Sequence, residues 1–150
     1  MRAILWFFSA ILVAGPAAAS GGFLCEAEDE KVSLGVNGGV TRGMGSAVFS
    51  LQGKLELHDD GLADDLRRTE FERAHLAQYW LDGSELRLLL YREREGAGPH
   101  GYAELTLKAV ASEGGSYSGD YVVDLFDMTD AANSEGKTAR FEGRVSCSVE

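Results

Sequence analysis

Residues 75–95, HLAQYWLDGSELRLLLYRERE, decide the fold. Two runs of strand-forming residues flank Asp82-Gly83, and this dipeptide between alternating apolar positions is typical of a β-hairpin. A loop of two residues, or of four (82–85), would place one apolar set on a common core face: Ala77, Tyr79, Leu81, Leu86, Leu88 and Leu90. A loop of three residues would exchange the two faces of the first strand. The stretch therefore predicts antiparallel β-structure.

The opposite face of this hairpin is the candidate binding surface. Its members, by the same alternation, are Leu76, Trp80, Arg87, Leu89 and Tyr91. Aromatic residues and arginine are enriched at binding hot spots, and six of the 14 basic residues fall within 67–94. In a second interpretation, segment 59–73 covers Trp80 and Tyr91, and the arginines form ion pairs with nearby glutamates, namely Glu70, Glu72, Glu93 and Glu95.

The N-terminus has the pattern of a secretory signal peptide. Arg2 precedes an apolar run over 4–14, and Pro16 and three alanines follow before Ser20. The apolar run is too short to span a bilayer. We therefore expect a leader at 1–19, a single exported domain at 20–150, and a periplasmic or secreted protein without a membrane anchor after cleavage.

Two cysteines, Cys25 and Cys147, lie near the two ends of the expected domain. In an oxidising compartment an isolated pair is most simply a disulfide, and the spacing is not that of a Cys-x-x-Cys redox motif. Two separate buried thiols are the alternative. The disulfide would hold the first and last strands together.

The charge balance excludes one class of partner. The chain carries a net charge of −10, and removal of the leader takes away Arg2 and moves it to −11. An acidic domain repels phosphate backbones and anionic membrane surfaces, so nucleic acid is excluded as a partner.

The rest of the chain also alternates in the manner of half-buried strands. Further strands are predicted at about 22–29, 31–40, 47–58, 102–111, 117–128 and 138–149. Asn37-Gly38-Gly39 predicts either a turn or a bulge. Residues 59–73 are ambiguous, and we expect a loop with one or two helical turns followed by a strand from about Thr69. The pattern predicts about eight antiparallel strands in a β-sandwich or a closed up-and-down barrel.

No motif in the chain indicates chemistry. The three histidines lack metal-ligand spacing, and His58-Asp59-Asp60 with Asp64 and Asp65 is interpreted as a solvated acidic loop in preference to a cation site. Residues 115–119, GSYSG, have tyrosine where a nucleophile elbow requires serine. We predict no catalytic residues, metal or cofactor.

Three functions from different classes are compatible with these features. The first is a non-enzymatic interaction or accessory module of the bacterial cell envelope, with an envelope or extracellular protein as its partner. The second is a calycin-like barrel that carries a small apolar ligand. The third, a hydrolase, has the least support. An interaction module predicts a solid core and an exposed Trp80 face, whereas a carrier predicts an apolar cavity inside the barrel.

Overall fold

The structure is a computed structural model that describes residues 20–41, 47–129 and 135–150. The predicted leader and the glycine-rich segment 42–46 lie outside the described residues. Nine strands dominate the fold: β1 Ser20–Glu28, β2 Val32–Thr41, β3 Val48–Leu57, β4 Arg68–Glu72, β5 Leu76–Leu81, β6 Glu85–Glu93, β7 Gly101–Ala111, β8 Ser116–Asp127 and β9 Lys137–Val149. Three single helical turns join them: α1 Asp64–Arg67, η1 Arg73–His75 and η2 Glu113–Gly115.

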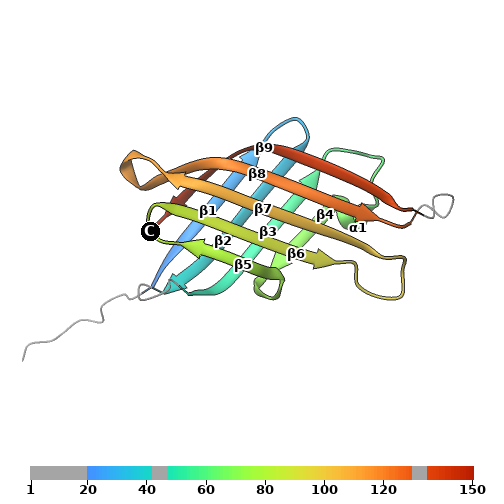
Figure 1. Cartoon of the computed structure of the whole chain (residues 1–150), viewed down its shortest axis with the longest axis horizontal. Coiled ribbons are helices and arrows are strands. Elements are labelled where there is room, and N and C mark those ends of the chain that lie inside the picture. Colours follow the sequence, from blue (N-terminus) through green and yellow to red (C-terminus); the bar gives the residue numbers. More distant parts are fainter. Residues whose placement is uncertain (1–19, 42–46, 130–134) are drawn as a thin grey trace, which may run out of the picture.

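All nine strands belong to one antiparallel sheet that curls into a nearly closed barrel (Figure 1). Their order is β4-β3-β2-β1-β9-β8-β7-β6-β5, so every strand except β4 and β5 pairs with both of its neighbours in the sequence, and the first and last strands pair with each other. The all-β prediction is confirmed, and of the two predicted architectures the barrel is the one found.

A seam remains between β4 and β5, the two edges of the sheet. Nine strands in an alternating row leave the edge strands pointing the same way, so these edges cannot close by antiparallel pairing. Instead β4, η1 and β5 are successive parts of one bent segment, 68–81. Its first part pairs with β3 and its second part pairs with β6. The segment therefore passes from one edge of the sheet to the other and connects them.

The barrel interior is filled with apolar side chains. Alternate residues of the strands point inward, and the buried ones form one contiguous cluster. The largest fully buried side chain is Tyr121, which lies against Gly143 and donates a hydrogen bond to Asp29. A Cβ at Gly143 would lie 2.7 Å from the Tyr121 ring, so the glycine makes room for it.

The disulfide is formed between Cys25 of β1 and Cys147 of β9. The two residues are directly opposite each other in the β1–β9 pairing, with their Cα atoms 4.0 Å apart, and both are buried. The bond spans 122 residues, and closing so long a loop in the unfolded chain stabilises the fold by about 5 kcal/mol. Such a bond is typical of proteins outside the reducing cytoplasm.

Two ambiguous segments are resolved by the structure. Residues 37–39 lie inside β2, where the register with β3 shifts between Gly39 and Val40, so the bulge is correct and the turn is not. Segment 59–73 contains one turn of helix, α1, and a strand from Arg68, as predicted. Among the described residues no helix is long and apolar enough to cross a membrane.

Candidate binding surface

The hairpin turn holds Trp80 in place. Leu81 pairs with Leu86, so the loop has four residues, one of the two predicted lengths. An Asp82 carboxylate oxygen accepts hydrogen bonds from the Ser84 hydroxyl (2.7 Å) and from the Ser84 and Glu85 amides (3.0 Å each). These hydrogen bonds lower the pKa of Asp82 far below its ordinary value, and the one from the Ser84 hydroxyl has the largest effect. The Asp82 carboxylate is therefore charged at neutral pH.

The other oxygen of Asp82 orients the tryptophan. The Trp80 indole nitrogen donates to it over 3.0 Å. Trp80 nevertheless remains 56% exposed, which is unusual for so large an apolar side chain. Its ring is therefore both oriented and solvent-accessible, and an oriented aromatic ring loses little conformational entropy on binding.

Three of the predicted residues, one of which is Trp80, line one shallow groove. The register places Trp80 beside Arg87, and Arg87 beside Lys108 of β7. Leu89 lies two residues further along β6 on the same face, opposite Thr106. The groove on this outer face is lined by Gln78, Tyr79, Trp80, Arg87, Leu88, Leu89, Thr106, Leu107 and Lys108. Trp80, Arg87 and Leu89 therefore form a continuous surface, which we call the Trp80 face.

Leu76 does not belong to this surface, and its predicted place on the outer face is wrong. The β5–β6 register shifts between Leu76 and Gln78, so Ala77 is the extra residue of a bulge. Leu76 therefore turns into the core opposite Leu90 and is only 9% exposed, whereas Ala77, predicted to point inward, is exposed. One inserted residue reverses the facing of everything before it.

Tyr91 lies on the outer face but joins a different group. Its ring packs against Tyr102 of β7, with centroids 5.3 Å apart, and Tyr102 stacks on Phe126 of β8 at 5.8 Å. The Tyr91 hydroxyl donates to Glu93, and burial together with this bond raises the pKa of Tyr91 to about 12. Sequence reasoning missed this row, because its members come from three strands whose register was unknown.

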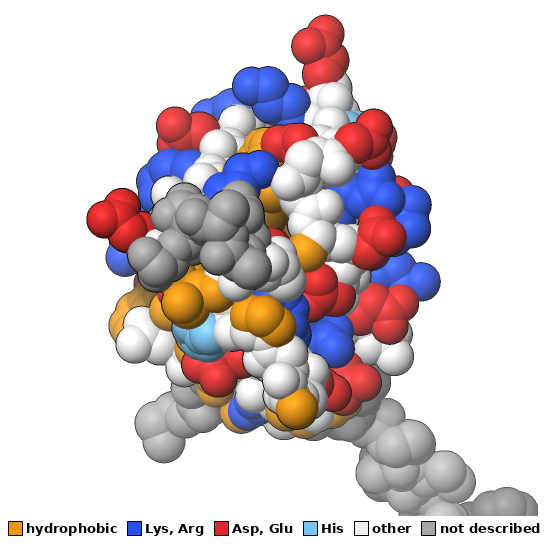
Figure 2. Space-filling view, turned by 90° about the vertical axis from the view of Figure 1, so that its right-hand side faces the viewer, with side chains coloured by type: hydrophobic (Ala, Val, Ile, Leu, Met, Phe, Trp, Pro, Cys, Tyr) orange, Lys and Arg blue, Asp and Glu red, His pale blue; other side chains and the backbone are white. Residues whose placement is uncertain are grey.

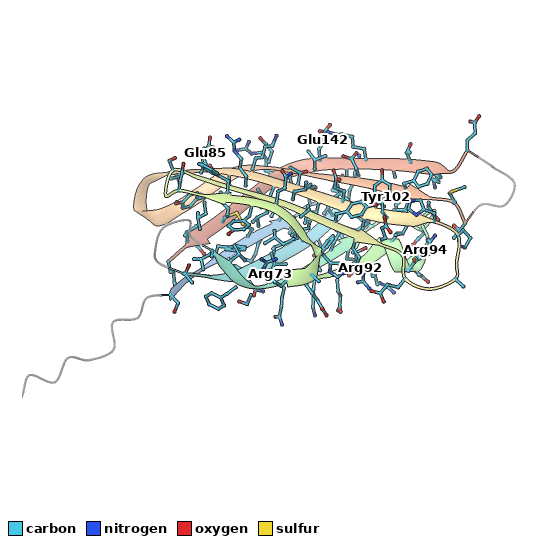
Figure 3. The ribbon with its side chains drawn as sticks, turned by 60° about the horizontal axis from the view of Figure 1, so that its bottom comes forward. Arg73, Glu85, Arg92, Arg94, Tyr102 and Glu142 are labelled. Atoms are coloured by element: carbon cyan, nitrogen blue, oxygen red, sulfur yellow. A yellow bond between two sulfur atoms is a disulfide. The ribbon has the colours of Figure 1, made fainter. Side chains whose placement is uncertain are left out.

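Arg87 belongs to the Trp80 face, but the other arginines of 67–94 come from α1, β4, η1 and the region around the end of β6, and Figure 3 shows Arg73, Arg92 and Arg94 away from that face. Most of them are ion-paired, but largely with partners that were not predicted: Asp60 and Asp64 with Arg67, Glu56 with Arg68, Glu85 with Arg87, Glu95 with Arg92, and Asp65 and Asp127 with Arg94. Of the predicted glutamates, Glu95 forms such a pair. Trp80 is not covered by segment 59–73, so that part of the second interpretation is wrong.

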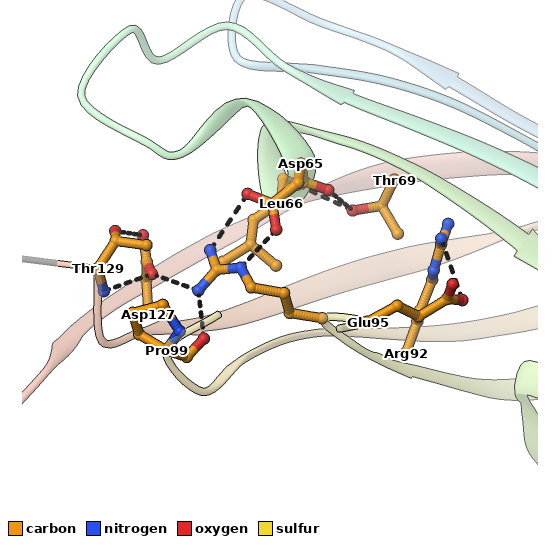
Figure 4. Close-up of polar contacts among 9 residues, drawn as sticks. Asp65, Leu66, Thr69, Arg92, Glu95, Pro99, Asp127 and Thr129 are labelled. Atoms are coloured by element: carbon orange, nitrogen blue, oxygen red, sulfur yellow. Dashed lines mark hydrogen bonds and ion pairs between the residues drawn. The ribbon is translucent and has the colours of Figure 1, made fainter. Parts of the chain in front are cut away.

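The most buried ion pair closes the end of the barrel that carries α1. The Arg94 side chain is 10% exposed and lies between two carboxylates (Figure 4). Its Nε is 2.5 Å from Oδ2 of Asp65 in α1, and its Nη1 is 3.0 Å from Oδ1 of Asp127 in β8. The same Nη1 also donates to the Pro99 carbonyl. Charged side chains of both signs lie next to each other over this end (Figure 2). Leu66 of α1 is buried beneath them.

The carboxylates of this cluster are stabilised in their charged form. The hydrogen bond from Arg94 lowers the pKa of Asp65. Burial acts to raise the pKa of Asp127, but hydrogen bonds from Thr129 and Arg94 outweigh it, so this pKa also lies below its ordinary value. Both carboxylates have a structural role, because each already accepts hydrogen bonds from neighbouring side chains, and a substrate would have to displace these donors.

No described residues are arranged for metal binding, since no group of three His, Cys, Asp or Glu side chains in these ranges is placed to hold an ion. Comparison of the chain with protein-family models, with curated proteins and with solved structures found no match.

Proposed function

We propose that this protein is a non-enzymatic interaction module of an exported compartment, periplasmic or extracellular, and that it binds a partner protein through the Trp80 face. The observation that carries the proposal is the exposed Trp80 ring, held by Asp82 beside Arg87 and Leu89. Tryptophan and arginine are the residues most enriched among binding hot spots.

The other two functions have less support. A carrier needs an apolar cavity, whereas the inward side chains of this barrel pack against one another in one cluster. A hydrolase needs convergent polar groups that are free to react, whereas Asp65, Arg94 and Asp127 are paired with each other. The disulfide and the predicted leader support an exported location.

Native mass spectrometry of the protein purified gently from its own compartment tests this proposal. We expect a retained protein mass in the wild type and in Ser146→Lys, a control on the exposed outer face of β9, and its loss in Trp80→Ser. Retention of the same mass by Trp80→Ser would contradict the proposal. A retained small-molecule mass would instead support the carrier.

A further inference from the structure

The β5 strand has a free edge. It pairs with β6 on one side, and on its other side, at the seam, it pairs with none of the described strands. The backbone groups along a strand edge alternate as donors and acceptors, and only another extended chain matches that pattern.

The two halves of the seam are protected very differently. Beside β4, Arg92 donates to the Glu70 carbonyl over 2.6 Å, and α1 covers the adjoining end of the barrel. The β4 sequence, RTEFE, is itself charged. The β5 sequence, LAQYWL, has neither charge nor proline, two of the features that protect an edge from pairing.

The inward side chains of β5 have a neighbouring strand, β6, on one side only. Tyr79 and Leu81 lie opposite Leu88 and Leu86, which are fully buried. Tyr79 and Leu81 are nevertheless only half-buried, and they pack against the core from one side. An added strand next to β5 would supply the missing apolar contacts.

A positively charged side chain, that of Arg73, lies near the N-terminal end of the β5 edge. Arg73, just before β5, donates through Nε to the Val48 carbonyl over 2.9 Å and so links the two sides of the seam. Within the described part of the chain, no carboxylate lies at ion-pair distance from Arg73, which is exposed. The guanidinium is therefore available to an incoming acidic group.

We infer that an extended segment of the partner protein adds to the free edge of β5 as an antiparallel strand. Its alternate residues are apolar and pack on Tyr79 and Leu81, and its C-terminal end carries a carboxylate that pairs with Arg73. The orientation follows from the direction of β5, which begins at Arg73, so the C-terminal end of an antiparallel strand lies there. This inference rests on the proposed function and names how the partner binds.

The test uses two synthetic peptides and the fluorescence of Trp80, the only tryptophan outside the predicted leader. The peptides are TVTVTVTE and TVTVTVTK, both amidated, and a third, TPTPTPTE, cannot form a strand. We expect the first to bind the wild type about threefold more tightly than the second, as one exposed ion pair allows, and the third not to bind.

Variants of Arg73 make the result decisive. Arg73→Glu should reverse the preference in favour of TVTVTVTK, and Arg73→Gln should abolish it, with circular dichroism confirming that both fold. Failure of both strand-forming peptides to bind, or the same preference in wild type and Arg73→Glu, would overturn the inference. If Trp80→Ser still releases the partner in that case, the proposed function stands and only this binding mode fails.

Discussion

At the scale of single residues, Gly119 is the described glycine at which an added Cβ would meet the closest neighbouring atom. It is an inward residue of β8, and a Cβ built there would lie 1.8 Å from the Lys108 carbonyl oxygen of β7. The Lys108 carbonyl is part of the backbone of β7, so it cannot move aside for the added Cβ as the end of a flexible side chain could. The close approach of the two strands therefore depends on the absence of a side chain.

We predict that Gly119→Ala lowers the free energy of unfolding by at least about 2 kcal/mol. The matched control is Gly35→Ala in β2, where a Cβ would have no atom within 4 Å. That variant should gain about 0.5 kcal/mol, because alanine has less freedom in the unfolded chain. Urea denaturation of both variants measures the difference, and equal stabilities would show that β7 and β8 do not approach so closely.

Arg94 is the second residue whose role the structure defines. Arg94→Met should destabilise the protein by about 3 kcal/mol, because it leaves Asp127, which is 12% exposed, charged and without its ionic partner. The control is Arg140→Met, which removes an exposed pair with Asp124 and should change stability by less than about 1 kcal/mol. If thermal unfolding shows similar losses for both, Arg94 does not close the barrel end.

At the scale of elements, the β5–β6 hairpin shows what the sequence could and could not predict. The turn was predictable, because Asp82-Gly83 has a specific backbone requirement and Gly83 indeed has φ of +85°. The bulge at Ala77 was not, since neither glycine nor proline marks it. Trp80, Arg87 and Leu89 lie after the bulge on the predicted face, whereas Leu76 lies before it and was misplaced.

This difference can be tested by lysine substitution on either side of the bulge. Leu76→Lys should destabilise the protein by about 3 kcal/mol, because it places a charge in the core. Leu89→Lys, on the half-buried outer side of β6, should change stability by less than about 1 kcal/mol. Chemical denaturation measures both, and tolerance of lysine at position 76 would contradict the bulge.

The bent segment formed by β4, η1 and β5 was only half visible in the sequence. A strand from about Thr69 and a strand in the hairpin were both predicted, and so was the helical turn before them. Their exchange of partners at Arg73–His75 depends on long-range pairing with β3 and β6, which local patterns do not encode. The seam, and with it the free edge of β5, therefore emerges only from the structure.

At the scale of the whole molecule, the charged clusters set the response to pH. Hydrogen bonds from Tyr121 to Asp29 and from Arg94 to Asp65 lower the pKa of each carboxyl, and that of Asp127 is also lowered. A lowered pKa stabilises the fold above the ordinary carboxyl pKa, and this stabilisation is lost as pH falls through the folded-state value.

We therefore predict a constant free energy of unfolding between about pH 5 and 8 and a steep decline below about pH 4. Asp65→Asn should be less stable at neutral pH and should flatten the acid decline. Asp120→Asn, which removes an exposed partner of Arg144, should leave the decline unchanged. Urea titrations across this pH range measure it, and an identical decline in Asp65→Asn would exclude Asp65 as a contributor.

The architecture as a whole was largely predictable, because alternating strands joined by short turns and a terminal cysteine pair favour an antiparallel barrel or sandwich. The choice between them required the pairing of β1 with β9, which places Cys25 opposite Cys147. Inside the barrel, the buried side chains of the described strands pack into one contiguous cluster.

The most direct test of the central claim, that the Trp80 face binds a protein, is site-specific photo-crosslinking in cells that produce the protein. A photoreactive phenylalanine analogue is placed at position 78, an exposed position that lines the groove and leaves Trp80 in place, or, as control, at position 146 on the exposed face of β9. The account predicts a discrete protein adduct at position 78 and none at position 146. No adduct at position 78, or equal adducts at both positions, would contradict it.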